Sequence, residues 1–203
     1  MAHNYSASDY VFQFITIMTG VLIAMLANGM VERSKERELV AQARSMIRRE
    51  IAANKQDLAA TLSGFPTDMQ ALDDALAFAN DMLAAGKTKV RSIQLHFNMA
   101  DIFDTSWRTA ERTAALSHMD YEEVQRYSKL YDFQEFFIAQ QRAAVSQLSL
   151  ASSLLGPGFD PDKPNRADLE IFRERVKSLR AALSLQETFA KRLDEFYDEA
   201  LKQ

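Results

Sequence analysis

The sequence predicts an all-α protein in which an N-terminal transmembrane helix continues into an antiparallel bundle of about four soluble helices. An uncharged apolar segment lies near the N-terminus. Long segments with apolar residues at alternating steps of three and four follow it, and prolines and glycines are confined to a few places. Long amphipathic helices joined by short connections are typical of antiparallel bundles.

Residues 10–31 form the predicted transmembrane helix. The segment YVFQFITIMTGVLIAMLANGMV has twenty-two residues without a charge, and about 20 are needed to cross the hydrocarbon of a bilayer. A cleaved signal peptide is the alternative, but no Lys or Arg precedes the segment and it is longer than a signal-peptide core. We therefore divide the chain into a short extracytoplasmic tail at 1–9, the membrane helix at 10–31 and a helical bundle domain at 32–203.

The flanking charges predict the orientation of this single-pass protein. No Lys or Arg lies before the span, whereas six follow it within twenty residues, namely Arg33, Lys35, Arg37, Arg44, Arg48 and Arg49. Lys and Arg are retained on the cytoplasmic side of a membrane. We expect a bacterial inner-membrane protein with its N-terminus outside and its main domain in the cytoplasm.

The first three helices are predicted from breakers and periodicity. The membrane helix continues without interruption and ends near Gly64-Phe65-Pro66, and a second helix runs from a Thr67 cap to Gly86. Alternation of Ile93, Leu95 and Phe97 favours an extended connector or a short helix in 87–103, because a lone strand has no partner. A third helix is expected from Thr105 to about His118.

Two long helices complete the predicted bundle. Asp120 and Glu123 form a capping box that opens a fourth helix, which ends at Gly156-Pro157 and turns Val124, Tyr127, Tyr131, Ile138, Val145 and Leu148 inward. The fifth helix has ten positions in phase, at strictly alternating steps of three and four, which indicates coiled-coil-like packing: Leu169, Phe172, Val176, Leu179, Leu183, Gln186, Ala190, Leu193, Tyr197 and Ala200.

Composition excludes several function classes. The net charge of −4 lacks the basic footprint of a nucleic-acid-binding protein, so we expect no nucleic-acid partner. The absence of cysteine excludes disulfides, thiolate nucleophiles and Cys-ligated metals. None of the three histidines has the spacing of a di-iron or zinc helix, and no glycine-rich phosphate loop is present. We therefore assign no catalytic residue, cofactor or metal ligand.

Two sets of residues are candidates for interaction. Thr16, Gly20, Ala24 and Asn28 recur every fourth residue of the membrane helix, and small residues at this spacing let two helices approach closely. Glu50 and Asn54 stand one turn apart at an apolar stripe and need polar partners where they are buried. Setting the register of the bundle is the simpler role for Asn54, and binding is the alternative.

Three patches carry a resemblance to known proteins: GVLIAMLAN at Gly20–Asn28 followed by Glu32, then Glu50-Ile51 with Asn54, and Trp107-Arg108-Thr109-Ala110. The chain resembles bacterial single-pass membrane proteins grouped under domains of unknown function. Many of these carry a Trp just after the span, where this chain has Gly29-Met30-Val31. The resemblance implies an architecture and no activity.

These observations lead to three functional hypotheses. The first is a non-enzymatic adaptor or assembly subunit whose partners are the lipid bilayer and either further copies of itself or another integral membrane protein. The second is a sensory or signalling bundle that binds a small ligand between its helices. The third is an enzyme that acts at the connector 87–104, with Arg91, His96, Asp101 and Asp104 as its first candidates.

Overall fold

The computed structural model describes residues 7–88, 93–156, 159–160 and 164–202, and over this part of the chain it contains helices and no strand. The predicted all-α class is therefore confirmed. The long helices are α1 (Ala7–Ala85), α3 (Tyr121–Ser152) and α4 (Arg166–Leu201). Three short elements accompany them: α2 (Thr105–Arg112) and the 3-10 turns η1 (Ala115–His118) and η2 (Ser153–Leu155).

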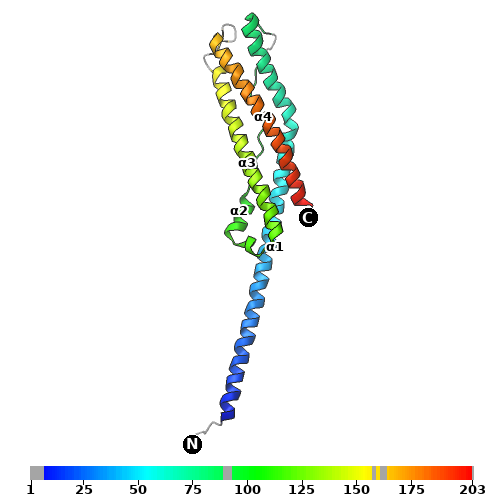
Figure 1. Cartoon of the computed structure of the whole chain (residues 1–203), viewed down its shortest axis with the longest axis vertical. Coiled ribbons are helices and arrows are strands. Elements are labelled where there is room, and N and C mark those ends of the chain that lie inside the picture. Colours follow the sequence, from blue (N-terminus) through cyan, green and yellow to red (C-terminus); the bar gives the residue numbers. More distant parts are fainter. Residues whose placement is uncertain (1–6, 89–92, 157–158, 161–163, 203) are drawn as a thin grey trace.

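The C-terminal part of α1 forms a bundle with α3 and α4 (Figure 1). Helix α4 packs against both α1 and α3 and runs antiparallel to them. The extended segment 93–104, which we call the strap, runs between α1 and α3 and bonds to side chains of both. Of the two forms that were predicted for 87–103, the described residues 93–103 have the extended one, and the strap takes the place of a fourth helix.

The predicted break at Gly64-Phe65-Pro66 is wrong, because α1 continues through Pro66 to Ala85. Proline in a helix interior costs about 3 kcal/mol through its missing N–H and its ring. Continuation keeps Phe65 on one side of the proline and Leu72 on the other in the same core, each at most 3% exposed. This apolar burial offsets the cost. Thr67 therefore caps no helix.

The predicted helix from Thr105 to His118 is also too long. Helix α2 ends at Arg112, and Ala114 has a left-handed backbone with φ of 57°. This reversal starts η1 and places Ala115, which is fully buried, in the core with Met119. The sequence contains no glycine or proline here, so nothing in it marked the turn.

The starts of α3 and α4 follow sequence signals. The Asp120 carboxylate accepts hydrogen bonds from the backbone N–H of Glu122 and Glu123, as an N-cap does. The reciprocal half of the predicted capping box is absent, because Glu123 pairs with Arg44 of α1 instead. Asn165 caps α4 by accepting from Ala167.

The inward positions of α4 agree with the prediction, whereas those of α3 agree in part. Nine of the ten predicted α4 positions are buried, and Ala200 is half-buried. In α3 Tyr127 and Tyr131 are buried, but Val145 is 38% exposed.

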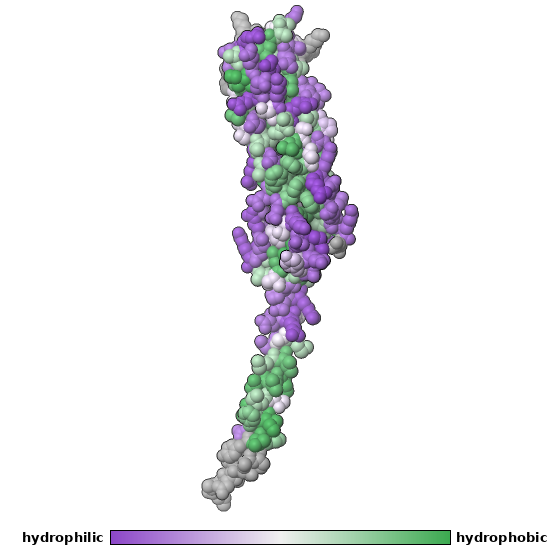
Figure 2. Space-filling view, viewed as in Figure 1, coloured by the Kyte–Doolittle hydropathy of each residue, from purple (hydrophilic) through white to green (hydrophobic). Residues whose placement is uncertain are grey.

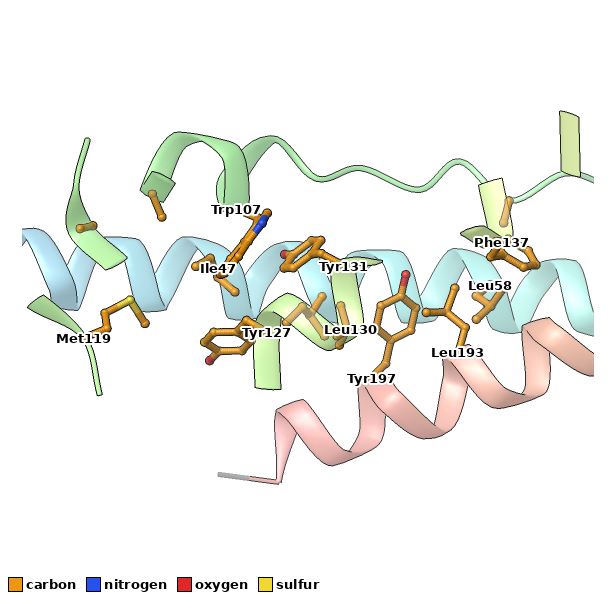
Figure 3. Packing of buried hydrophobic residues seen from close by; sticks show 14 of the residues in the cluster. Ile47, Leu58, Trp107, Met119, Tyr127, Leu130, Tyr131, Phe137, Leu193 and Tyr197 are labelled. Atoms are coloured by element: carbon orange, nitrogen blue, oxygen red, sulfur yellow. The ribbon is translucent and has the colours of Figure 1, made fainter. Parts of the chain in front are cut away.

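Two apolar clusters hold the bundle together. The cluster nearer the arm centres on Trp107, whose ring stacks on Tyr131 at 5.2 Å and meets Tyr127 edge-on (Figure 3). The second cluster joins α1 to α4 at the far end through Phe65, Leu72, Phe78, Phe172 and Leu179. Trp107 is thus a core residue, 8% exposed, as the more conservative interpretation of the sequence expects.

The N-terminal part of α1 projects beyond the bundle as a single helix, which we call the arm (residues 11–31). Its large apolar side chains are 43% to 74% exposed, and the surface there is almost continuously hydrophobic (Figure 2). By length and composition this part of α1 can cross a membrane. A hydrophilic neck with the sequence ERSKERE (32–38) separates the arm from the bundle.

Candidate functional site

The structure concentrates its buried polar groups where the strap passes between α1 and α3. Asn54, only 1% exposed, is at the centre. Its Oδ1 accepts from the Phe103 N–H at 3.0 Å, and its Nδ2 donates to the Phe103 carbonyl at 2.7 Å. One carboxamide thus satisfies both backbone groups of one strap residue.

Helices α3 and α4 complete this layer. Gln134 donates from Nε2 to the Phe103 carbonyl at 3.0 Å, and its Oε1 accepts from Asn54 Nδ2 at 3.2 Å. The same Oε1 accepts from the Tyr197 hydroxyl at 2.7 Å. Burial raises the pKa of Tyr197 well above its usual value, so the hydroxyl stays a donor. The network joins all three long helices to the strap.

Glu50 lies one turn before Asn54 and fixes the end of the strap. Its carboxylate accepts from the Tyr131 hydroxyl at 2.8 Å and from the Ser106 N–H at 2.8 Å. Ser106 belongs to the first turn of α2, where the cap residue Asp104 makes no side-chain cap bond. Glu50 therefore supplies the cap from α1. Burial, followed by the Glu50 charge, raises the pKa of Tyr131 far above its ordinary value.

A second clamp of the same kind holds Ala100. Gln141 of α3 accepts from the Ala100 N–H at 3.1 Å and donates to its carbonyl at 3.0 Å. Gln186 of α4, fully buried, donates to Gln141 Oε1 at 3.3 Å. Sequence analysis missed Gln141, although a glutamine in phase with the apolar stripe of a helix is a signal that could have pointed to it.

Carboxylates of α1 hold the rest of the strap. Asp68, 2% exposed, accepts from the Asn98 N–H at 2.9 Å, and Asp57 accepts from the Asp101 N–H at 2.5 Å. Gly64 lets the strap pass closely, since a Cβ there would lie 2.5 Å from Asn98 Nδ2. The glycine that was interpreted as a helix terminator thus serves a close approach between two segments.

The residues proposed for an enzyme at the connector make separate structural contacts. His96 approaches Asp68 at 4.0 Å, Asp101 bonds through its backbone to Asp57, and Asp104 pairs with Arg108 at 2.6 Å. Arg91 lies outside the described residues. Among the residues that the structure describes, no three His, Cys, Asp or Glu side chains gather as metal ligands do.

The small-residue face of the arm is open in the single chain. A Cβ built on Gly20 would meet nothing within 4 Å. The Thr16 hydroxyl donates to the Phe12 carbonyl of its own helix at 2.9 Å, so its hydrogen is already used. Asn28 is exposed, and its carboxamide has no hydrogen-bond partner in the described part of the chain.

Searches against protein-family models, curated proteins and solved structures find no match for this chain.

Proposed function

We propose that the chain is a membrane-anchored, non-enzymatic interaction or assembly subunit. The observation that carries this proposal is the continuity of α1. One helix of 79 residues includes both the exposed apolar arm and one of the long helices of the bundle. A partner that binds the arm within the membrane is therefore held in a fixed position relative to the bundle.

The exposed Asn28 side chain supports a contact between helices. In hydrocarbon an unpaired carboxamide costs several kcal/mol, because no water is present to replace a lost partner. Asn28 has no such partner among the residues that the structure describes. A second helix packed on Thr16, Gly20, Ala24 and Asn28 supplies one, and the partner is a second copy of this chain or another integral membrane protein.

The proposed location is the bacterial inner membrane with the N-terminus outside. Six basic residues follow the span and none precedes it, and this asymmetry keeps the flanking domain in the cytoplasm. In this arrangement the neck crosses the headgroup layer and the bundle stands in the cytoplasm, where its surfaces are accessible to other proteins.

The strap clamps support a structural use of the buried polar residues. Asn54, Gln134 and Gln141 form hydrogen bonds with backbone atoms of the strap, and Asn54 also donates to Gln134. Buried polar groups of this kind fix the register of packed elements. Within the proposal they shape the bundle as one rigid body.

Purification in mild detergent, followed by mass spectrometry of the co-purifying proteins, tests the proposal. We expect either a stoichiometric integral membrane protein or a defined oligomer of this chain. A protein that is monomeric in native membranes by chemical crosslinking, and that purifies alone, contradicts it. A co-purifying small molecule without a protein partner favours the sensory alternative.

A further inference from the structure

Three arginines gather around a cavity at the end of the bundle nearest the arm, and sequence analysis did not single them out as a group. The cavity measures about 350 Å³ and is lined by Arg44 and Arg48 of α1, Glu123, Arg126 and Tyr127 of α3, and Ala200 of α4. All three long helices therefore contribute to it. Among the residues that line the cavity, three guanidinium groups stand against one carboxylate, which leaves this lining with an excess of two positive charges.

The fixed part of this cavity is Arg44 with Glu123. Arg44 donates from Nε and Nη2 to the two carboxylate oxygens at 2.7 Å and 2.5 Å. Hydrogen bonding to Glu123 raises the pKa of Arg44 above its usual value. The pair neutralises itself and forms a rigid wall, with the Glu123 side chain 13% exposed.

The remaining donors have unused capacity. Arg48 donates from Nη2 to the Leu201 carbonyl at 2.9 Å, a bond that holds the guanidinium without neutralising it. Arg126 is exposed and has no hydrogen-bond partner among the described residues. The Tyr127 hydroxyl also has none there, although Tyr127 is 4% exposed and held by its contact with Trp107.

Arg48 of α1 and Arg126 of α3 are the two guanidinium groups of this lining that have no carboxylate partner among the described residues. An anion with several oxygens supplies the missing negative charge, and guanidinium groups bind such oxygens through paired N–H donors. A phosphate group matches these donors in charge, because its oxygens can accept from both guanidinium groups and from the neutral Tyr127 hydroxyl at the cavity wall.

We propose that this cavity binds a phosphate-bearing anion, with Arg48, Arg126 and Tyr127 as its ligands and the Arg44–Glu123 pair as its wall. The cavity is too far from the bilayer for a lipid headgroup. Arg44 follows Val31 by 13 residues, which is about 20 Å of helix, whereas the headgroup layer is roughly 5 to 7 Å thick. A dissolved phosphate compound is therefore the occupant. This choice of source rests on the proposed membrane position, but the site does not.

Titration calorimetry of the full chain with inorganic phosphate and with pyrophosphate, at constant ionic strength, tests the proposal. We expect saturable binding in the millimolar range or below. Arg126→Gln removes an exposed, unpartnered side chain, so it should leave the melting temperature without phosphate unchanged while weakening binding about tenfold or more. Arg48→Lys keeps the charge and loses the planar fork, so it should weaken binding as well.

Arg142→Gln is the matched control. Arg142 is exposed on the same helix, the charge change is the same, and it lies 16 residues from Arg126, about 24 Å away along the helix. Equal losses in both variants indicate a general charge effect and overturn the proposal, as does the absence of binding in the wild type.

The chain in nanodiscs of defined lipid distinguishes a dissolved phosphate compound from the phosphate of a lipid headgroup. Equal phosphate affinity in phosphatidylcholine and phosphatidylglycerol discs supports a dissolved anion. Loss of phosphate binding in phosphatidylglycerol discs would mean that a lipid headgroup occupies the site, and it would contradict binding of a dissolved phosphate compound. None of these results depends on a protein partner, so they leave the assembly proposal to its own test.

Discussion

Asn54 of α1 clamps the backbone of Phe103, accepting from its N–H at 3.0 Å and donating to its carbonyl at 2.7 Å. Gln141 of α3 holds Ala100 in the same way. A fourth helix in place of the strap would pair its own backbone N–H and C=O groups. The extended strap has no neighbouring strand to do so. The two carboxamides, together with Asp57, Asp68 and Gln134, supply the missing partners.

Replacing Asn54 by Leu should destabilise the bundle by about 2 to 3 kcal/mol, because both backbone groups of Phe103 lose a partner in a site that water does not enter freely. Urea unfolding followed by circular dichroism measures the change. Gln56→Leu on the exposed side of the same helix is the control and should change stability little. Equal effects of the two substitutions would show that the clamp adds nothing.

Replacing Pro66 by Ala should stabilise the protein by about 1 to 2 kcal/mol. The substitution restores a helix hydrogen bond and removes the ring clash, and the greater freedom of the unfolded chain returns part of that gain. Thr67→Ala, also on the exposed face, should gain at most about 0.7 kcal/mol. Thermal melting compares the two variants, and a less stable Pro66→Ala protein argues against one continuous helix.

Alkaline pH should unfold the bundle through Tyr131 and Tyr197. Burial raises the pKa of both above the unfolded value, which is about 10. Their contribution to stability is therefore fully present below about pH 10 and declines above it, where the unfolded chain loses the protons first. Tyr131→Phe should reduce this pH dependence, measured by melting between neutral and alkaline pH. The exposed Tyr121, replaced by Phe, should not change it.

Replacing Gly20 by Ile should disrupt assembly in the membrane, because a β-branched side chain on the small-residue face keeps two backbones apart. Leu22→Ile alters another side of the arm with no change of volume, so its complex should persist. Crosslinking in native membranes reports the outcome. The same complex in both variants would show that the arm is a tether and that the bundle recognises the partner.

A phosphatase that is active only in the periplasm should show no activity when fused to Gln203, because the orientation that we propose from the basic flank puts the bundle in the cytoplasm. A fusion before Ala7 whose reporter requires export should be active, which controls for expression. Activity at the C-terminal fusion reverses the orientation and places the cavity at Arg48 outside the cell.

The sequence alone determined the features that depend on local periodicity. The all-α class, the apolar arm, the buried stripe of α4 and the cap at Asp120 are visible because helix periodicity and capping act over a few neighbouring residues. Glu50 and Asn54 stood out as polar residues at an apolar stripe for the same reason.

Tertiary structure decided the features that depend on distant partners. The passage of α1 through Pro66 depends on Phe65 and Leu72 sharing a core with α4, and the turn at Ala114 depends on where Ala115 can be buried. The partners of Asn54 come from 49 and 80 residues further along the chain, and Glu123 leaves its predicted capping box for Arg44, 79 residues away. At these places the energy of contacts between distant helices outweighs the local preference of the sequence. A pattern of neighbouring residues does not contain that energy.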